Sequence, residues 1–137
     1  KLKLERRLNA IVYLNQDWEE SYGGHLDIWR GHRDGKRHVL DECVEQVLPI
    51  FNRMVVFATS EKSYHGHPDP VSCPPDRTRK SIALYYYTKD RPQDESVDAH
   101  STTFIKRPTD PDNDELDTMR EERNQGRFKS NLKSNLK

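Results

Sequence analysis

Residues 8–15 read LNAIVYLN, and this stretch decides the fold class that the sequence predicts. It is rich in β-branched and aromatic residues, which suit the pleated, half-buried surface of a sheet. The polar pair Gln16 and Asp17 follows directly and breaks the pattern. The stretch is therefore predicted to be a β-strand.

Three further stretches have the composition of strands, and they are residues 25–30 (HLDIWR), 54–59 (MVVFAT) and 81–88 (SIALYYYT). The first of them alternates, which places Leu26 and Ile28 on one face of the strand. Residues 39–48 fit both the helical and the strand period. They are predicted to form either a strand or a short helix.

Turns and loops are predicted between these strands. Gly23 and Gly24 permit a positive φ and indicate a turn, and the charged residues 31–37 (GHRDGKR) indicate another. Residues 68–75 hold four prolines, which lack the amide hydrogen that a strand ladder needs, so they are predicted to form a loop. Short strands joined by turns predict an all-β fold, an antiparallel sandwich or barrel.

The chain divides by composition into two parts. Of its 44 apolar and aromatic residues, 35 fall in residues 1–89 and nine in residues 90–137. The first part can bury a core, whereas the second is predicted to be a polar tail that is disordered or loosely attached. Within the tail a short charged helix is predicted near residues 115–127, and the end of the chain repeats KSNL twice.

Charge, hydropathy and cysteine content exclude several classes of protein. The 23 Lys and Arg residues balance 23 Asp and Glu residues, so no broad phosphate-binding surface and no nucleic-acid partner are expected. No stretch approaches the roughly 18 apolar residues of a membrane span, so no membrane contact is expected. Cys43 and Cys73 form no cystine framework and are predicted to be reduced, which favours an intracellular, cytoplasmic protein.

Four features follow one another in a distinctive order along residues 6–88. They are YLN at residues 13–15, the Gly23-Gly24 pair, a histidine in KSYHGHP and an arginine in RTRKS. In this order the sequence resembles the catalytic half of the 2-oxoglutarate- and Fe(II)-dependent oxygenases of the prolyl-4-hydroxylase type. The resemblance implies that residues 1–89 are the C-terminal part of a double-stranded β-helix, a jelly-roll or cupin-like barrel, truncated at its N-terminus.

The resemblance also implies a site for iron and 2-oxoglutarate. His65 matches the distal histidine that binds Fe(II), and Arg79 matches the basic residue that grips the remote carboxylate of 2-oxoglutarate. Tyr13 matches the tyrosine that adds a hydrogen bond to that carboxylate. Arginine suits the task because its planar fork pairs with a carboxylate through two parallel hydrogen bonds.

The implied activity is that of a dioxygenase. It would couple the oxidative decarboxylation of 2-oxoglutarate by O2 to the hydroxylation of a C–H bond, with the cofactor carrying the difficult chemistry. A prolyl residue in a protein is the substrate that the resemblance favours, and ascorbate is a further candidate cofactor. No side chain is predicted to be catalytic beyond those that hold iron and cosubstrate.

The alternation of side chains supports both anchor residues independently of the resemblance. Arg79 shares a strand face with Ala83, whose small side chain leaves room for a ligand. Tyr13 shares a face with Ile11. Each strand can therefore present one polar anchor among apolar neighbours, as in many small-molecule pockets.

Each of these residues also has a purely structural interpretation. Tyr13 could be a cross-strand aromatic, and Arg79 could be a solvated charge at the start of a strand. His67 could join His65 on a metal if both lay on one strand face, but it precedes Pro68 and is assigned to the loop. His32, His38 and His100 are interpreted as surface residues, the tryptophans as packing residues, and the cysteines as unreactive.

The first two iron ligands of the family form a His-x-Asp pair upstream of the YLN strand. Residues 1–12 contain no His and no Asp, so the chain as given is expected to be a fragment that lacks the pair and is inactive alone. His25 and Asp27 spell a substitute in HLD, but we reject it, because its ligands would come from a different strand. All ligands must lie within about 2.0–2.2 Å of one metal ion.

A second interpretation belongs to another functional class. The chain could be a non-catalytic β-barrel binding module that kept the barrel, lost the iron site and uses its acidic-then-basic tail for docking. A His-x-Asp pair encoded before Lys1 would favour the enzyme over this module.

Overall fold

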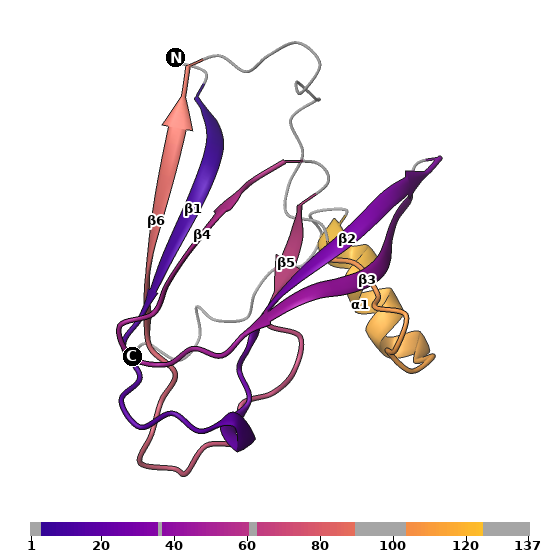
Figure 1. Ribbon diagram of the computed structural model, residues 1–137. Coiled ribbons are helices and arrows are strands. Elements are labelled where there is room, and N and C mark those ends of the chain that lie inside the picture. The colour runs from indigo at the N-terminus through magenta and orange to yellow at the C-terminus, as the bar shows by residue number, and fades with distance from the viewer. Residues whose placement is uncertain (1–3, 36, 61–62, 90–103, 125–137) are drawn as a thin grey trace, which may run out of the picture.

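The computed structural model describes residues 4–35, 37–60, 63–89 and 104–124, and it consists mainly of two antiparallel sheets (Figure 1). Each sheet has three strands, in the orders β4-β1-β6 and β3-β2-β5. The all-β class predicted from the sequence is confirmed, and the two sheets agree with a truncated jelly roll. Within the described ranges they remain separate sheets and do not close into a barrel.

The first sheet is built on β1 (Glu5–Tyr13), which lies between β4 (Met54–Ala58) and β6 (Ser81–Thr88). Both neighbours run antiparallel to β1. All three strands fall on stretches predicted to be strands, because their β-branched and aromatic side chains suit a pleated surface.

The second sheet is built on β2 (Leu26–Asp34), which lies between β3 (Arg37–Val47) and β5 (Tyr64–Gly66). Residues 39–48 were predicted to form either a strand or a short helix, and all but the last of them lie in the strand β3. The short strand β5 and a 3-10 helix at Glu20–Tyr22 were not predicted from the sequence.

The turn predicted at residues 31–37 is wrong for most of its length, because β2 and β3 both extend into it. The reversal itself lies at Gly35, which has a φ of 59°. Gly31 instead lies at a register shift between β2 and β3, where an added Cβ would overlap the Val39 carbonyl oxygen. This glycine serves a close backbone approach at a bulge and does not mark a turn.

The outer face of the first sheet is apolar and exposed. Side chains that pair across antiparallel strands share a face, so Val12 lies on the same face as Met54 and Ile82. Met54 is 61% exposed and Ile82 is 50% exposed. Burial of this strand face is therefore incomplete within the described residues.

The inner face of the first sheet looks toward the second sheet. Phe57 lies opposite Asn9 of β1. Ile11 and Tyr13 follow Asn9 by two and four residues, so their side chains lie on the same inner face as Phe57. The ring of Phe57 lies 4.5 Å from the ring of His65 on β5, measured between centroids. This contact joins the two sheets and places His65 on the inner side.

The hydrophobic core of the described residues is small and is centred where the two sheets approach. Its buried members come from β1, β2, β3 and the connection after β1: Ala10, Tyr13, Trp18, Leu26 and Leu40. Trp18 packs edge-on against Tyr22 at 5.5 Å, and its indole nitrogen donates a hydrogen bond to the Gly23 carbonyl oxygen at 3.0 Å. The packing role predicted for Trp18 thus supports the Gly-Gly turn.

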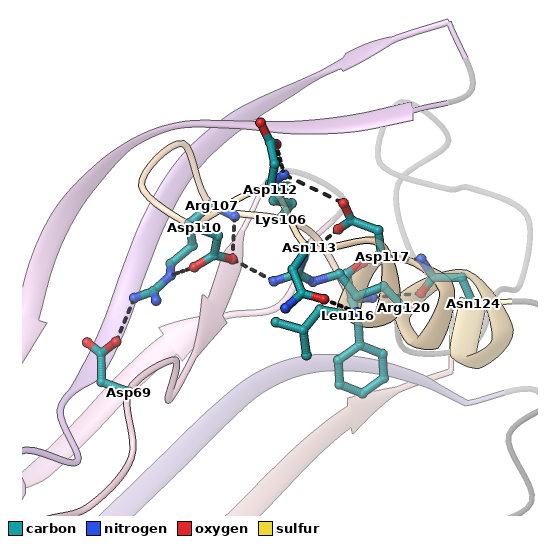
Figure 2. Close-up of polar contacts among 11 residues, drawn as sticks. Asp69, Lys106, Arg107, Asp110, Asp112, Asn113, Leu116, Asp117, Arg120 and Asn124 are labelled. Carbon is teal, nitrogen blue, oxygen red and sulfur yellow. Dashed lines mark hydrogen bonds and ion pairs between the residues drawn. The ribbon is translucent and has the colours of Figure 1, made fainter.

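The C-terminal segment, residues 104–124, contains the helix α1 (Asp114–Asn124) and is tied to the loop that follows β5 (Figure 2). The guanidinium of Arg107 donates hydrogen bonds to Asp69 at 3.0 Å and to Asp110 at 2.7 Å. Asp110 also accepts a hydrogen bond from Arg120 of α1 at 2.7 Å. One carboxylate therefore joins the helix to the arginine that reaches the sheet region.

The helix predicted near residues 115–127 coincides with α1 up to Asn124. Residues 125–127 and the KSNL repeat lie outside the described residues, as do residues 90–103. The disorder or loose attachment predicted for the tail stays a prediction. No helix in the described ranges combines the length and apolar character that crossing a membrane requires.

Candidate functional site

The candidate site begins with Tyr13, the last residue of β1, whose side chain is fully buried. Its backbone is held by the loop before β4, since its N–H donates to Arg53 O at 2.9 Å and its carbonyl accepts from Asn52 N at 3.0 Å. Across the strand pair it lies opposite Ser81, the first residue of β6. The small serine leaves the space beside the tyrosine ring to the chain that precedes β6.

Arg79 comes from that preceding chain and lies against Tyr13. Its guanidinium carbon is 5.1 Å from the centroid of the Tyr13 ring, within cation–π range. Its Nη2 lies 3.5 Å from the tyrosine hydroxyl, and its Nε donates a hydrogen bond to the Gly24 carbonyl oxygen at 2.7 Å. The structure thus brings together the two residues assigned to the remote carboxylate.

Gly24 has no side chain, and Arg79 occupies the space that a side chain there would fill. An added Cβ at this position would lie 2.8 Å from Cδ and 3.2 Å from Nε of Arg79. The φ of Gly24 is 73°, a conformation that side chains with a Cβ rarely adopt. The sequence predicts a turn at the glycine pair, and the structure shows that Gly24 also borders the site.

His67 is a site residue that sequence analysis missed. It lies in the loop after β5, as predicted, but its ring nitrogens are both 2.9 Å from Nη2 of Arg79. Its Nδ1 is also 2.7 Å from the carbonyl oxygen of His25. No local pattern pointed to its contact with Arg79, because its partners lie 12 and 42 positions away in the sequence.

Burial and mutual contact set the electrostatics of the Tyr13–Arg79 pair. Burial raises the pKa of Tyr13, and the charge and hydrogen bond of Arg79 only partly oppose this. Burial lowers the pKa of Arg79, and the contact with Tyr13 partly restores it. The tyrosine is therefore a neutral hydrogen-bond donor at pH 7, and the arginine remains a cation because its intrinsic pKa is so high.

Within the described part of the chain, Arg79 pairs with no carboxylate. Desolvating a cation is costly unless an opposite charge compensates for it. A partly buried guanidinium beside a neutral hydroxyl donor therefore favours an anionic ligand, and a carboxylate suits the planar fork. The donor set on this inner face fits the remote carboxylate of 2-oxoglutarate.

His65, the residue assigned to iron, lies on β5 and faces Phe57. Burial lowers the pKa of His65, a hydrogen bond to the Ser63 carbonyl oxygen raises it, and the charge of Arg6 lowers it further. Nδ1 lies 3.3 Å from that carbonyl oxygen and so carries the proton of the neutral ring. The lone pair is left on Nε2, which is the form that a metal-binding imidazole requires.

The rest of an iron site does not gather around His65. In the ranges that the structure describes, no three His, Cys, Asp or Glu side chains cluster as metal ligands would. Asp27 lies opposite Gly66 while its neighbour Ile28 lies opposite His65, so Asp27 points to the other face of the sheet. His25 is turned toward Glu20, at 2.8 Å. The described residues thus offer one candidate iron ligand and no complete set.

Comparison with known proteins places most of this region in a single family. The sequence model of the family described as "2OG-Fe(II) oxygenase superfamily" matches residues 1–87. Prolyl 3-hydroxylase OGFOD1 of Mus musculus is 30% identical over 83 residues, which are 60% of this chain and 14% of that protein. The chain therefore spans a small part of this relative. No solved structure matches the chain.

Proposed function

This chain belongs to the 2OG-Fe(II) oxygenase superfamily, and from that premise we propose that its inner face holds 2-oxoglutarate in a hydroxylase. One observation carries the proposal: Arg79 is partly buried, makes no ion pair with the described carboxylates, and lies 3.5 Å from the Tyr13 hydroxyl. A partly buried cation beside a neutral donor is an arrangement that a carboxylate ligand completes.

Arg79, Tyr13 and the apolar side chains beside them would each make a different contact with 2-oxoglutarate. Nε of Arg79 is engaged by the Gly24 carbonyl oxygen, so the two terminal nitrogens of the fork are the ones that would meet the remote carboxylate. Tyr13 would donate its hydroxyl hydrogen to the same carboxylate, because its raised pKa keeps it protonated. Ile11 and Ala83, which pair on the same face, would offer apolar contacts to the middle of the ligand.

The family name implies Fe(II) beside 2-oxoglutarate. His65 would serve as one ligand through Nε2, on the same inner side as Arg79. The described residues do not supply the remaining iron ligands, so His65 is the one iron ligand that we propose. Ascorbate stays a candidate cofactor without support from the structure.

For the full-length protein we propose hydroxylation of a prolyl residue in a protein substrate. The relative described as a prolyl 3-hydroxylase supports this choice, although the chain matches only 14% of it. The overall reaction consumes 2-oxoglutarate and O2 and yields succinate, CO2 and a hydroxylated substrate, so its atoms balance with one oxygen atom in succinate and one in the new hydroxyl group.

The test is turnover by the native full-length protein. Supplied with Fe(II), 2-oxoglutarate and O2, it should form succinate, and proline-containing peptides should increase that rate and gain 16 mass units, the mass of one oxygen atom. Binding of 2-oxoglutarate without any succinate under these conditions would favour the non-catalytic binding module. Absence of both binding and turnover would refute the proposal.

A further inference from the structure

Asn15 is the last residue of the YLN sequence at the end of β1, and its side chain is buried, with 4% of the residue exposed. Its Nδ2 donates a hydrogen bond to the Pro49 carbonyl oxygen at 2.6 Å. Its Oδ1 accepts a hydrogen bond from the backbone N–H of Lys80 at 2.5 Å. Pro49 lies 34 positions away in the sequence and Lys80 lies 65 positions away, so one side-chain amide joins three separate segments.

The two backbone partners fix the orientation of the Asn15 amide. A carbonyl oxygen can only accept a hydrogen bond, so Nδ2 is the atom that faces Pro49. A backbone N–H can only donate, so Oδ1 is the atom that faces Lys80. Because Pro49 is fully buried, water cannot easily replace the amide as its partner, and loss of the amide would leave buried backbone groups unpaired.

The peptide group that Asn15 holds is the one that directly follows Arg79. The Lys80 N–H belongs to the peptide bond between Arg79 and Lys80, and the Lys80 carbonyl oxygen accepts a hydrogen bond from Leu14 N at 3.2 Å. Residues 77–80 precede β6 and lie outside both sheets. These bonds to the end of β1 therefore fix the backbone from which the Arg79 side chain starts.

The other end of the Arg79 side chain is held separately. Its Nε donates to the Gly24 carbonyl oxygen at 2.7 Å, and its guanidinium carbon lies 5.1 Å from the centroid of the Tyr13 ring. An arginine side chain has several rotatable bonds, and its freedom is costly to remove. Fixing the backbone as well as the tip limits the positions that the guanidinium can take before a ligand binds.

We propose that Asn15 is a positioning residue for the cosubstrate: through its hydrogen bond to the Lys80 N–H it fixes the backbone of Arg79, and with it the guanidinium that receives the remote carboxylate of 2-oxoglutarate. The inference rests on the proposed function, because it takes Arg79 as the residue that binds this carboxylate. Preorganised groups bind more tightly because less freedom is lost on binding.

Two substitutions of nearly the same shape separate the two bonds of Asn15. Asn15→Leu keeps the branched side chain and removes both bonds. Asn15→Asp keeps an oxygen that accepts from the Lys80 N–H, but a carboxylate cannot donate to the Pro49 carbonyl. Both substitutions should lower the melting temperature, since each leaves a buried backbone group unpaired. Only Asn15→Leu loses the bond to Lys80.

The experiment measures KM for 2-oxoglutarate and kcat in the native full-length protein with Fe(II). Asn15→Leu should raise KM roughly 5- to 10-fold, a factor within the net value of one hydrogen bond, and should leave kcat within about threefold. Asn15→Asp should keep KM within about twofold of the native value despite its lower melting temperature. A role limited to stability would instead make KM follow the melting temperature in both variants.

A milder variant keeps the test decisive if Asn15→Leu does not fold. Asn15→Ala leaves room for water to reach the two backbone groups, so it should cost less stability. It still removes the side chain that holds the Lys80 N–H, and it should raise KM at least about threefold.

Three controls tie the effect to Arg79 and to the remote carboxylate. Lys80→Ala removes an exposed side chain and keeps the backbone N–H, so KM should stay within about twofold of the native value. In an Arg79→Ala background, Asn15→Leu should add nothing, since a residue that acts through another shows no separate effect once that other is removed. Inhibition by 2-oxovalerate, which has a methyl group in place of the remote carboxylate, should be equally strong with Asn15 and with leucine at this position.

The possible results are distinguishable. If Arg79→Ala left KM unchanged, the proposed carboxylate site itself would be wrong. If Arg79→Ala raised KM while Asn15→Leu and Asn15→Ala did not, only the role of Asn15 would be overturned. Equal rises of KM in Asn15→Leu and Asn15→Asp would also overturn it, because the bond to Lys80 would then not be the one that matters. The same holds for a full additional loss from Asn15→Leu in the Arg79→Ala background, since Asn15 would then act independently of Arg79.

Discussion

The guanidinium of Arg79 lies over the ring of Tyr13, with 5.1 Å between the guanidinium carbon and the ring centroid, although the residues are 66 positions apart in the sequence. The contact with Tyr13 raises the pKa of Arg79 and so helps to keep it charged, whereas Arg79 lowers the pKa of Tyr13 and only partly offsets the rise that burial causes. The contact joins the end of β1 to the chain that leads into β6. It is the centre of the predicted cosubstrate site.

Replacing Arg79 by alanine in the full-length protein should weaken 2-oxoglutarate roughly 10- to 150-fold, because hydrogen bonds to charged groups contribute about 1.5–3 kcal/mol. Arg79→Lys should recover only part of this affinity, since an ammonium keeps the charge but not the fork. Titration of 2-oxoglutarate under anaerobic conditions with Fe(II) measures the effect.

The matched control is Arg77→Ala, because Arg77 lies two residues away and its guanidinium bonds the carbonyl oxygens of Gln16 and Asp17. Its loss should leave 2-oxoglutarate affinity within about threefold of the native value, as expected for a residue outside the site. In contrast to both arginine substitutions, His65→Ala should abolish the binding of iron. If Arg77→Ala weakened the cosubstrate and Arg79→Ala did not, the wrong basic residue would have been chosen.

Tyr13 combines a structural and a binding role, which two substitutions can separate. Tyr13→Phe keeps the buried ring and removes the hydroxyl, so 2-oxoglutarate affinity should fall about 2- to 13-fold, the equivalent of about 0.5–1.5 kcal/mol. Tyr13→Ala leaves a cavity where a fully buried ring was, and should lower the free energy of unfolding by about 3–5 kcal/mol. Denaturant unfolding and cosubstrate titration of both variants check this. A Tyr13→Phe protein that bound 2-oxoglutarate normally would confine the tyrosine to packing.

The strands of this protein could be predicted from sequence because their signal is local. Residues 8–15 and 81–88 carry β-branched and aromatic side chains, and they form most of β1 and β6. A glycine among charged residues is typical of a turn, so the sequence around Gly31 predicts one, whereas in the structure Gly31 permits a close approach to Val39 across a bulge. A tertiary contact, which no short window contains, decided its role.

Only some residues of the candidate site could be predicted from the sequence. Tyr13 and Arg79 were assigned from the resemblance and from strand parity, and the structure brings them into contact, while their binding roles stay predictions. His67 and Gly24 could not be assigned, because each matters only through Arg79, which reaches them from a distant segment. The alternation of side chains along a strand predicts which residues share a face of the sheet. It does not predict which residues of a distant loop will contact that face.

Gly24→Ala should damage both stability and cosubstrate binding. The φ of 73° is strained for alanine, and the new Cβ would lie 2.8 Å from Cδ of Arg79 and displace the guanidinium. The free energy of unfolding should fall by about 1 kcal/mol or more, and KM for 2-oxoglutarate should rise roughly 10-fold or more as Arg79 moves.

Gly35→Ala is the matched control for Gly24→Ala. Gly35 also has a positive φ, of 59°, but an added Cβ there would meet nothing within 4 Å. It should show the loss of stability, measured by denaturant unfolding, with KM unchanged. Equal effects of both substitutions on KM would mean that backbone strain, and not the space for Arg79, explains the result.

Asp110 should hold the C-terminal segment in place through its two arginine partners. Its side chain is 10% exposed and lies 2.7 Å from Nε of Arg107 and 2.7 Å from Nη2 of Arg120. Figure 2 draws both contacts as dashed lines. Asp110→Asn removes the charge that both guanidinium groups share, so the amide hydrogens of α1 should exchange faster with solvent. Asp112→Asn is the control, because Asp112 is fully exposed and, among the described residues, bonds only Lys106; such surface pairs contribute little.

The same carboxylate predicts how the segment responds to pH. Burial alone would raise the pKa of Asp110, but hydrogen bonds from the backbone and side chain of Arg107 and the charges of Arg107 and Arg120 outweigh it and lower the pKa below the ordinary 3.8. A carboxyl group whose pKa falls on folding stabilises the folded form above its unfolded pKa, and this stabilisation is lost as the pH falls through the folded value. Exchange at α1 should therefore be slow and constant from pH 7 to about pH 5, after correction for the intrinsic rate, and should accelerate below about pH 4 in the native chain but not further in Asp110→Asn. Acceleration that began near pH 6, or that was equally steep in the asparagine variant, would assign the pH response to other groups.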